Sequence, residues 1–322
     1  MSTMLRKISV KSAVSNLYVV GVLAIIILVF TLISPKFIGV PNIVNILRQS
    51  VPAILVSGAF TLLMISGNID LSVGGIVGLT TVIYALAAKA GLGFFWAGVV
   101  ALAVGALIGV LNGFLVMKLR IVGVIATLAT MNLCVGFGKL LAPSGIGVIK
   151  GLPEGIELFA RARFFLRLPL AFYAAILVTV LLVIFQKKMV LGKYTAAIGG
   201  NRTAAELSGV NVVKTVWILY IMVGFCAALG GVARASYLSL GDPITGMGME
   251  MNAIIAVLLG GTSFYGGEGS VVRTIVAVLI LTCLAAGLQV IGMPPYWSSL
   301  VKGVVLILAL VIDILVQERI LD

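Results

Sequence analysis

The chain has 322 residues, of which 61% are hydrophobic and only 10% are charged, and its mean hydropathy is +1.26. A soluble domain normally carries about a quarter charged residues, so this composition excludes a protein whose whole surface faces water. The net charge of +12 does not indicate nucleic-acid binding, because the 22 Lys and Arg residues lie mostly between apolar segments. Topology signals and contacts with lipid headgroups explain them better. We therefore expect an integral membrane protein that binds lipid and no nucleic acid.

The first apolar stretch begins near Leu17 and ends at Ser34-Pro35 without a small-residue cleavage site. It is too long for the apolar core of a signal peptide, so we interpret it as a retained first helix. The chain then divides into a tail over residues 1–16, a single transmembrane domain over 17–316 and a second tail over 317–322.

Ten apolar runs follow one another, and each predicts a helix because backbone groups that face lipid must be satisfied within their own segment. The runs cover residues 17–34, 51–66, 71–88, 93–117, 121–142, 168–186, 215–233, 249–262, 271–292 and 296–316. Run 249–262 is short and glycine-rich at its end, which makes it a candidate for a broken or re-entrant segment. Merging the second and third runs would lower the count. The sequence predicts an all-α, polytopic membrane fold of about ten transmembrane helices.

An even number of spans places both termini on one side of the membrane. If that side is the cytoplasm, 12 basic residues lie on the cytoplasmic (inside) face and 10 on the outside face. This small difference does not determine the orientation of the chain. Local density is more informative, since five of the inside residues fall in the segment 187–214 and three in the N-terminal tail. We expect cytoplasmic termini, although the loop 143–167 then places four basic residues outside.

The segment 187–214 also contains a helix signal. Thr203-Ala-Ala-Glu206 has the spacing of a capping box, its alanines favour a helix, and Gly209 suits the C-terminal turn. Such a short helix could lie on the lipid headgroups, or it could dock a partner protein.

Glycines recur at helical spacing inside the apolar runs. Gly105, Gly109 and Gly113 lie four residues apart on one face, as do Gly74 and Gly78. This spacing lets helix backbones approach closely. Close packing within the chain is the simpler interpretation, and a dimer seam is the alternative.

Polar residues within or beside the apolar runs are candidates for a path across the membrane. Asp70 lies in a polar break, where a carboxylate either caps the next helix or serves a substrate path or gate. Neutral amides can donate and accept, as a polyhydroxylated ligand requires, but inter-helix hydrogen bonds are an equally good use of them. The path candidates are Asn68, Asp70, Asn112, Asn132, Asn252 and Gln289.

The sequence offers no set of residues for catalysis, for a metal or for ATP. It has no histidine, and Cys134, Cys226 and Cys283 lie singly in apolar runs, where small buried hydrophobic residues are expected. No G-x-x-x-x-G-K-[ST] pattern occurs, so the chain has no P-loop. We expect a transport protein without a cofactor of its own. If transport is driven by ATP, the motor is another polypeptide.

Three stretches in a fixed order resemble one family. They are Asp70-Leu-Ser-Val-Gly74, the segment from Gly192 to Val210, and the segment from Leu240 to Ser270. In order and spacing, the chain from about Phe37 to Asp313 is similar to the ribose/galactose/xylose-type ABC transporter permeases. The resemblance implies a type II ABC importer permease fold in the bacterial inner membrane. It also implies a homo- or heterodimer, a cytosolic ABC ATPase that holds ATP and Mg, and a periplasmic or lipid-tethered sugar-binding protein.

The resemblance also assigns roles to residues, and it supports the cytoplasmic termini. The segment around residues 199–209 matches the ATPase-contacting segment of the family. The coupling candidates are Gly199, Gly200, Asn201, Ala204, Ala205, Glu206, Ser208 and Gly209. Asp242 and Glu250 bracket a hairpin that is expected to face the binding protein. Met251-Asn252 stands where the family usually has Leu-Asp, which removes a carboxylate and leaves the substrate open.

The expected function is import of a monosaccharide by alternating access at a dimer interface. Permeases of the same broad family for nucleosides, autoinducers or branched-chain amino acids are alternatives. An ion-coupled secondary transporter is a second alternative, because the glycine-rich interruptions at 67–75 and 259–270 would suit broken helices. Uptake that persists without an ATPase and collapses with an uncoupler would favour it. A membrane enzyme would need a paired acid–base constellation that the sequence lacks.

Overall fold

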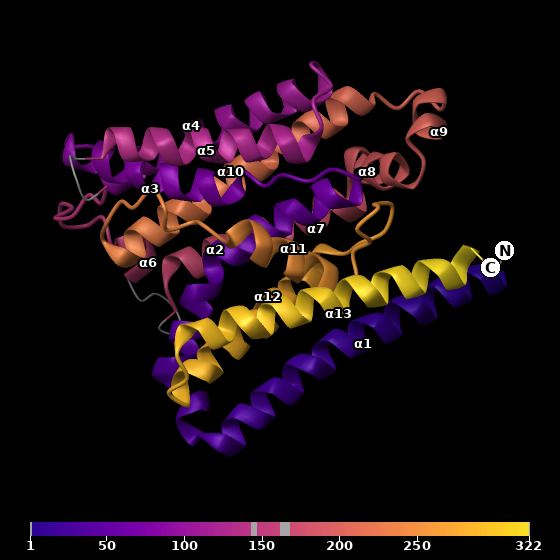
Figure 1. Ribbon diagram of the computed structural model, residues 1–322, viewed down its shortest axis with the longest axis horizontal. Helices are drawn as coiled ribbons and strands as arrows, with labels where there is room; N and C mark the ends of the chain where they lie inside the picture. The colour runs from indigo at the N-terminus through magenta and orange to yellow at the C-terminus, as the bar shows by residue number, and fades with distance from the viewer. Residues whose placement is uncertain (1, 143–146, 162–167, 322) are drawn as a thin grey trace.

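The computed structural model describes residues 2–142, 147–161 and 168–321, and the side chains of 18–142, 147–161 and 168–311 (Figure 1). The elements of this part are helices. They are α1 (Ser2–Ile33), η1 (Pro35–Ile38), α2 (Val40–Ile65), α3 (Val73–Lys89), α4 (Phe94–Met117), α5 (Gly123–Leu141), α6 (Leu158–Arg161), α7 (Leu170–Lys188), α8 (Val190–Gly200), α9 (Arg202–Leu207), α10 (Val212–Leu238), α11 (Met249–Leu259), α12 (Val271–Val290) and α13 (Pro295–Leu321). One isolated bridge, Ile149 with Gly241, is the strand-like pairing among the described residues.

Each predicted apolar run coincides with a helix, and the second and third runs form two helices, α2 and α3, rather than one. In the described part, α2, α4, α5, α7, α10 and α12 are long and apolar enough to cross a membrane by length and composition. The short run forms α11, which has 11 residues. At 1.5 Å per residue α11 is about 16 Å long, which is too short for a hydrocarbon core of about 30 Å. The full count of about ten spans stays a prediction.

The two ends of the chain lie toward the same end of the long axis, which is also where α8 and α9 lie (Figure 1). The helices α1 and α13 continue into the segments predicted as tails, since α1 begins at Ser2 and α13 ends at Leu321. The start of α1 and the end of α13 are therefore grouped with the α8–α9 segment, and the side of the membrane on which they lie stays a prediction.

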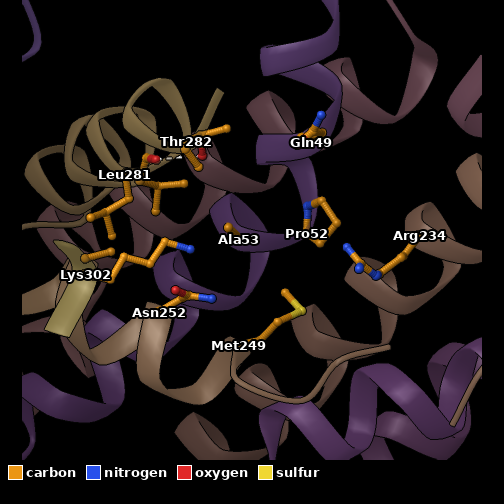
Figure 2. A pocket seen from close by; sticks show the side chains of 12 residues that line it. Gln49, Pro52, Ala53, Arg234, Met249, Asn252, Leu281, Thr282 and Lys302 are labelled. Carbon is orange, nitrogen blue, oxygen red and sulfur yellow. Dashed lines mark hydrogen bonds between the residues drawn. The ribbon is translucent and has the colours of Figure 1, made fainter. Parts of the chain in front are cut away.

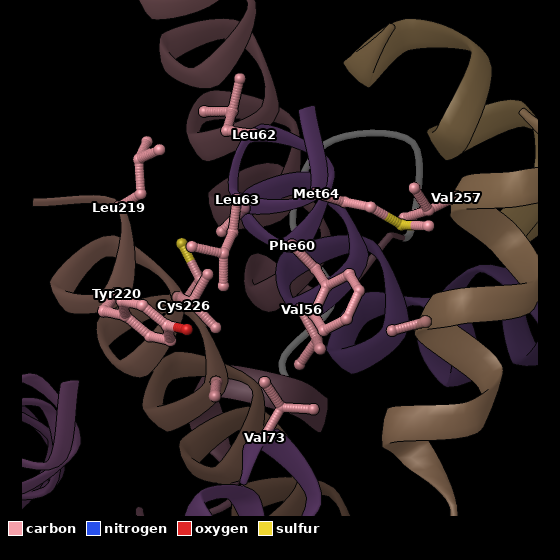
Figure 3. Packing of buried hydrophobic residues seen from close by; sticks show 14 of the residues in the cluster. Val56, Phe60, Leu62, Leu63, Met64, Val73, Leu219, Tyr220, Cys226 and Val257 are labelled. Atoms are coloured by element: carbon pink, nitrogen blue, oxygen red, sulfur yellow. The ribbon is translucent and has the colours of Figure 1, made fainter. Parts of the chain in front are cut away.

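The core forms where α2, α3 and α10 meet. Figure 3 shows Phe60 and Leu63 of α2 packed with Val73 of α3 and with Tyr220 and Cys226 of α10. These five side chains are buried, and the second half of α2 is buried on all sides. A helix that is apolar all round belongs in the interior of a protein, so α2 and α10 form the centre of the bundle.

The outer helices expose apolar side chains in a way that a water-soluble protein would not. Leu107 of α4, Ile125 of α5 and Leu177 of α7 are each exposed by more than 60%. Lipid tails are as apolar as these side chains, so contact with a bilayer accounts for them. Cys134, Cys226 and Cys283 are free and buried, which confirms that they serve as small hydrophobic residues.

The spaced glycines of α4 face α10 of the same chain. A methyl group at Gly109 would lie 2.5 Å from the Tyr220 carbonyl oxygen and 2.7 Å from the Ile221 Cα. Gly105 lies equally close to Gly224 and Ala228 of α10. Close packing within the chain, rather than a seam between two chains, is therefore the role of these glycines.

Replacing Gly109 with alanine is expected to destabilise the protein, because the added methyl group meets backbone atoms that cannot rotate away. Overpacking of this kind costs about 1–3 kcal/mol. The measurement is the thermal midpoint of the purified protein in detergent. Gly136→Ala on α5 is the matched control, because a methyl group there meets open space. Equal midpoints for the two variants would contradict the tight α4–α10 contact.

Candidate functional site

Asp70 lies in the α2–α3 turn and belongs to a buried polar cluster with Ser72 and Asn112, here named the Asp70 cluster. Its Oδ1 accepts hydrogen bonds from the Ser72 backbone N–H at 2.8 Å and from the Ser72 hydroxyl at 2.5 Å. Asn112 of α4 donates through Nδ2 to Asp70 Oδ2 at 3.2 Å and to Ser72 Oγ at 2.8 Å. The Asn112 Oδ1 atom is buried without a partner. The cluster ties the start of α3 to the last two turns of α4.

The N-cap position of α3 is Ser72, and its side chain makes no capping bond. Asp70 does not occupy the N-cap position itself, but it satisfies a free N–H group at this helix start, as the capping prediction expects. The carboxylate bonds the N–H two residues along, which is an Asx turn. Asp70 thus both shapes the turn and satisfies a backbone donor at the start of α3.

Two further bonds hold the α2–α3 turn between α5 and α10. The Leu71 N–H donates to Thr127 Oγ1 at 3.0 Å, and the Tyr220 hydroxyl donates to the Ile69 carbonyl oxygen at 3.2 Å. Asn68 is half-buried in the same turn and donates to the Ser66 carbonyl oxygen and hydroxyl at 3.0 Å each. The turn is thus fixed by α4, α5 and α10 together.

The structure does not bring the six path candidates into one site. Asn132 is exposed on α5 and donates to the Leu128 carbonyl oxygen of its own helix at 3.0 Å. Gln289 is exposed near the end of α12. Asp70 and Asn112 meet in the Asp70 cluster, and Asn252 lines a cavity elsewhere in the bundle.

This cavity, of about 160 Å³, lies between α2, α10, α11, α12 and α13 (Figure 2). Its polar lining consists of Gln49, Arg234, Asn252, Thr282 and Lys302, and its other walls are apolar apart from backbone. Arg234 donates through Nε to Thr245 Oγ1 at 2.7 Å, and Thr282 donates to the Val278 carbonyl oxygen at 2.8 Å.

Sequence reasoning missed four of the five polar groups in the cavity. Arg234 and Lys302 entered it only through the count of basic residues on the two sides of the membrane, whereas Arg234 belongs to α10 and Lys302 to α13. The available signal was their position inside apolar helices, where an ionisable residue is a functional candidate by default. Gln49 and Thr282 carried no comparable signal, because neutral polar residues are common in helices.

The α8–α9 segment presents a short exposed helix. The Asn201 Oδ1 atom accepts from the Ala204 N–H at 2.9 Å, so α9 begins after Asn201 and the predicted capping box at Thr203 is wrong. The predicted turn at Gly209 is confirmed, since its φ is +82° and it lies in the left-handed region. The Gly209 N–H donates to the Glu206 carbonyl oxygen and the Val210 N–H to that of Ala205, both at 3.0 Å, as in a Schellman motif.

The surface of α9 is almost fully accessible. Leu207 is 86% exposed, and Arg202 and Glu206 form an exposed ion pair at 3.2 Å on the same helix. An apolar side chain at this exposure gains nothing from the fold of its own chain. Ala205 is the buried residue that holds α9 to the bundle.

The end of α8 touches two other elements at one point, here named the Gly199 contact. The Gly267 N–H donates to the Ile65 carbonyl oxygen at 2.8 Å, which joins the loop 260–270 to the last residue of α2. Gly199 packs directly on this bond, because a methyl group there would overlap both partners. The neighbouring Gly200 faces open space. Only a residue without a side chain fits at position 199.

Asp242 and Glu250 flank the loop between α10 and α11, and they differ in exposure. Asp242 is half-buried, and its Oδ1 accepts from the Ile244 N–H at 3.0 Å. Glu250 is 8% exposed and packs against Gly74 of α3, with Oε1 bonded to the Gly248 N–H at 3.0 Å and Oε2 unpartnered. The Glu250 carboxylate thus points into the protein.

Sequence comparison matches residues 42–310 to the family described as the branched-chain amino acid transport system permease component. The chain is 38% identical over 296 residues to the ribose import permease protein RbsC of Escherichia coli (strain K12), covering 90% of this chain and 91% of that protein. It is 34% identical over 291 residues to RbsC of Bacillus subtilis (strain 168), covering 90% of each. Its identity to the galactose/methyl galactoside import permease protein MglC of Escherichia coli (strain K12) is 33% over 321 residues, covering 94% and 95%. No solved structure gives a significant match.

Proposed function

Because the chain belongs to the family of branched-chain amino acid transport system permease components, we propose that it is the membrane subunit of a monosaccharide importer. In this proposal the importer is driven by ATP and depends on an external binding protein. Similarity to ribose and galactose permeases over nine tenths of the chain supports the substrate class. The observation that carries the coupling role is the exposed helix α9, joined through α8 and the Gly199 contact to a helix that lines the cavity.

The proposed mechanism is alternating access without covalent chemistry. A separate ABC ATPase on the cytoplasmic side holds ATP and Mg, and it docks on α9 with Leu207 as the apolar anchor. Closure of the ATPase displaces α8 and α9, and the Gly199 contact passes this displacement to α2 and to the loop 260–270. The chain works as a homo- or heterodimer, and a sugar-binding protein delivers the substrate to the opposite face.

In this mechanism the cavity belongs to the substrate path. Gln49, Asn252 and Thr282 can exchange hydrogen bonds with sugar hydroxyls. The path needs little affinity of its own, because the binding protein captures the substrate. The Asp70 cluster has a different role, since its groups bond one another and hold the α2–α3 turn.

Replacing Leu207 with aspartate is expected to detach the ATPase while the permease stays folded. The side chain is 86% exposed, so a charge there costs the isolated chain little, but it would face an apolar partner surface. The measurement is the amount of P-loop ATPase, and of vanadate-sensitive ATP hydrolysis, that co-purifies with the tagged chain from its native host. Recovery should fall at least about tenfold, which corresponds to about 1.4 kcal/mol. Leu207→Met is the matched control and should retain the ATPase.

Recovery of the same ATPase with Leu207→Asp would show that α9 is not the docking element. A preparation of the unmodified chain that yields no ATPase in several detergents would oppose the importer itself. If uptake then persists without an ATPase and collapses with an uncoupler, an ion-coupled carrier becomes the better proposal. Uptake of a nucleoside or a branched-chain amino acid in place of a sugar would keep the mechanism and change the substrate.

A further inference from the structure

The cavity has a cationic lining. Arg234 and Lys302 contribute two cationic side chains from α10 and α13, and no carboxylate lines the cavity. Among the residues that the structure describes, Lys302 has no acidic partner within ion-pair distance. Arg234 donates through Nε to Thr245 Oγ1, and the Asp242 carboxylate, which lies outside the cavity lining, is close enough to interact with its charge. Both side chains extend toward the space between α2 and α11 (Figure 2).

A smaller adjoining cavity adds a third cation. It shares Gln49, Pro52 and Arg234 with the first cavity and is lined by Arg48 and Tyr237. The Arg48 guanidinium carbon lies 5.3 Å from the centre of the Tyr237 ring, and Arg48 Nε is buried without a hydrogen-bond partner. The positive field therefore continues along α2 beyond the main cavity.

A cation in a low-dielectric interior raises the free energy of the protein unless an anion lies close to it, and no carboxylate of the cavity lining does so for Lys302. An occupant with a negative charge removes this cost, whereas a neutral occupant supplies hydrogen bonds and leaves the charge uncompensated. Arginine suits this role because its planar donor fork matches a carboxylate or a phosphate. The neutral groups of Gln49, Asn252 and Thr282 remain available for hydroxyls on the same ligand.

The size of the cavity limits the ligand. Sites for drug-sized molecules measure about 300–1,000 Å³, so a cavity of about 160 Å³ takes a single sugar ring rather than an oligosaccharide. We propose that the cavity binds an anionic monosaccharide, one that carries a carboxylate or a phosphate. The proposal rests on the proposed function, and it names the chemical class of the transported substrate.

Binding to the purified full-length chain in lipid nanodiscs tests this proposal without the partner subunits. The readout is the shift of the thermal midpoint with a neutral hexose, a hexuronate, a hexose 6-phosphate and inorganic sulfate, each titrated into the millimolar range. The hexuronate or the hexose phosphate, or both, should stabilise the chain at concentrations at least tenfold below the neutral hexose. The two anionic sugars separate carboxylate from phosphate as the charged group, and sulfate reports on binding of an anion without a sugar.

Charge variants locate the binding site. Lys302→Gln and Arg234→Gln should each weaken the anionic sugar about tenfold. Asn252→Asp places a carboxylate beside the two cations, so it should weaken the anionic sugar by a much larger factor than the neutral hexose, a difference that a merely structural defect would not produce. Lys214→Gln is the matched control, because it removes an exposed charge near the start of the same helix as Arg234.

Three results would overturn the proposal. They are an equal shift with neutral and anionic hexose, an equal shift with sulfate and anionic sugar, and no shift with any compound. Uptake by the intact importer separates this failure from failure of the proposed function. ATP-dependent uptake of a neutral sugar that is unaffected by Lys302→Gln would support the proposed importer and refute the proposal that its substrate is anionic. Absence of ATP-dependent uptake for every sugar would refute the importer.

Discussion

Replacing Gly199 with alanine is expected to uncouple ATP hydrolysis from uptake in the intact importer, while the same change at Gly200 leaves transport intact. The two glycines are neighbours at the end of α8, so both substitutions change helix propensity equally. They differ in what the added methyl group meets. At Gly199 it overlaps the two atoms of the hydrogen bond from the Gly267 N–H to the Ile65 carbonyl oxygen, and at Gly200 it meets open space.

The size of the effect follows from the role of the contact. Coupling free energies between two sites are typically about 1–3 kcal/mol, which corresponds to about 5–150-fold. If the Gly199 contact is the main connection between α8 and α2, Gly199→Ala should reduce uptake per ATP hydrolysed by a factor in this range. The measurement is sugar uptake into proteoliposomes in parallel with ATP hydrolysis. Co-purification of the ATPase at normal levels is the control for assembly.

Normal coupling in Gly199→Ala would show that displacement of α8 reaches the cavity by another route. Loss of the ATPase from the complex would show that position 199 matters for assembly instead. Equal impairment of Gly199→Ala and Gly200→Ala would mean that the helix end, rather than its contact with α2, is what transport requires.

Replacing Asp70 with alanine is expected to destabilise the chain by about 2–5 kcal/mol. The change removes the acceptor of the Ser72 N–H, the Ser72 hydroxyl and the Asn112 amide, all of which are buried. Each buried donor without an acceptor costs about 1–3 kcal/mol. The thermal midpoint should fall by on the order of 10 °C. Asp70→Asn keeps the oxygen that accepts from the Ser72 N–H and hydroxyl, so its loss should be smaller.

This pair of variants decides between the two roles that the sequence left open for Asp70. A structural role predicts that uptake falls in proportion to the amount of folded protein and that Asp70→Asn transports well. Normal stability of Asp70→Asn combined with complete loss of uptake would instead assign the carboxylate to the substrate path. Asn132→Ala is the control, because that amide is exposed and bonds only its own helix. It should change neither stability nor uptake.

Sequence patterns predicted the helices well because lipid exposure and burial both demand long apolar segments. The boundaries were harder to predict where polar residues occur inside a helix. Helix α2 begins at Val40, eleven residues before the predicted run, because Asn42, Asn45, Arg48 and Gln49 interrupt its first turns. At α9 two residues, Asn201 and Thr203, could serve as the N-cap, and asparagine, the stronger capping residue, occupies it.

The site could not be predicted from sequence to the same degree, because its groups meet across long sequence separations. Asp70 and Asn112 are 42 residues apart, and each alone was a path candidate. Arg234 and Lys302 meet at one cavity only because α10 packs on α2, α13 packs on α11, and α2 and α11 pack on each other. The sequence of neither helix indicates that the charged residue of the other lies nearby. The chemical character of each residue could be predicted from the sequence. Which residues lie together depends on how the helices pack.

Helix α2 has a further mechanical consequence, since it reaches from the cavity wall at Pro52 to the Gly199 contact at Ile65. Pro52 and Ile65 lie thirteen positions apart, which spans about 20 Å, and Pro52 lacks the N–H that would bond the Arg48 carbonyl, which makes the helix easier to bend there. The segment can therefore act as a lever with its pivot at the cavity. A tilt of about 10° moves the Ile65 end by about 3 Å while residues at the pivot barely shift. Substrate contacts near Pro52 would then keep their geometry while the far end of the lever opens and closes access.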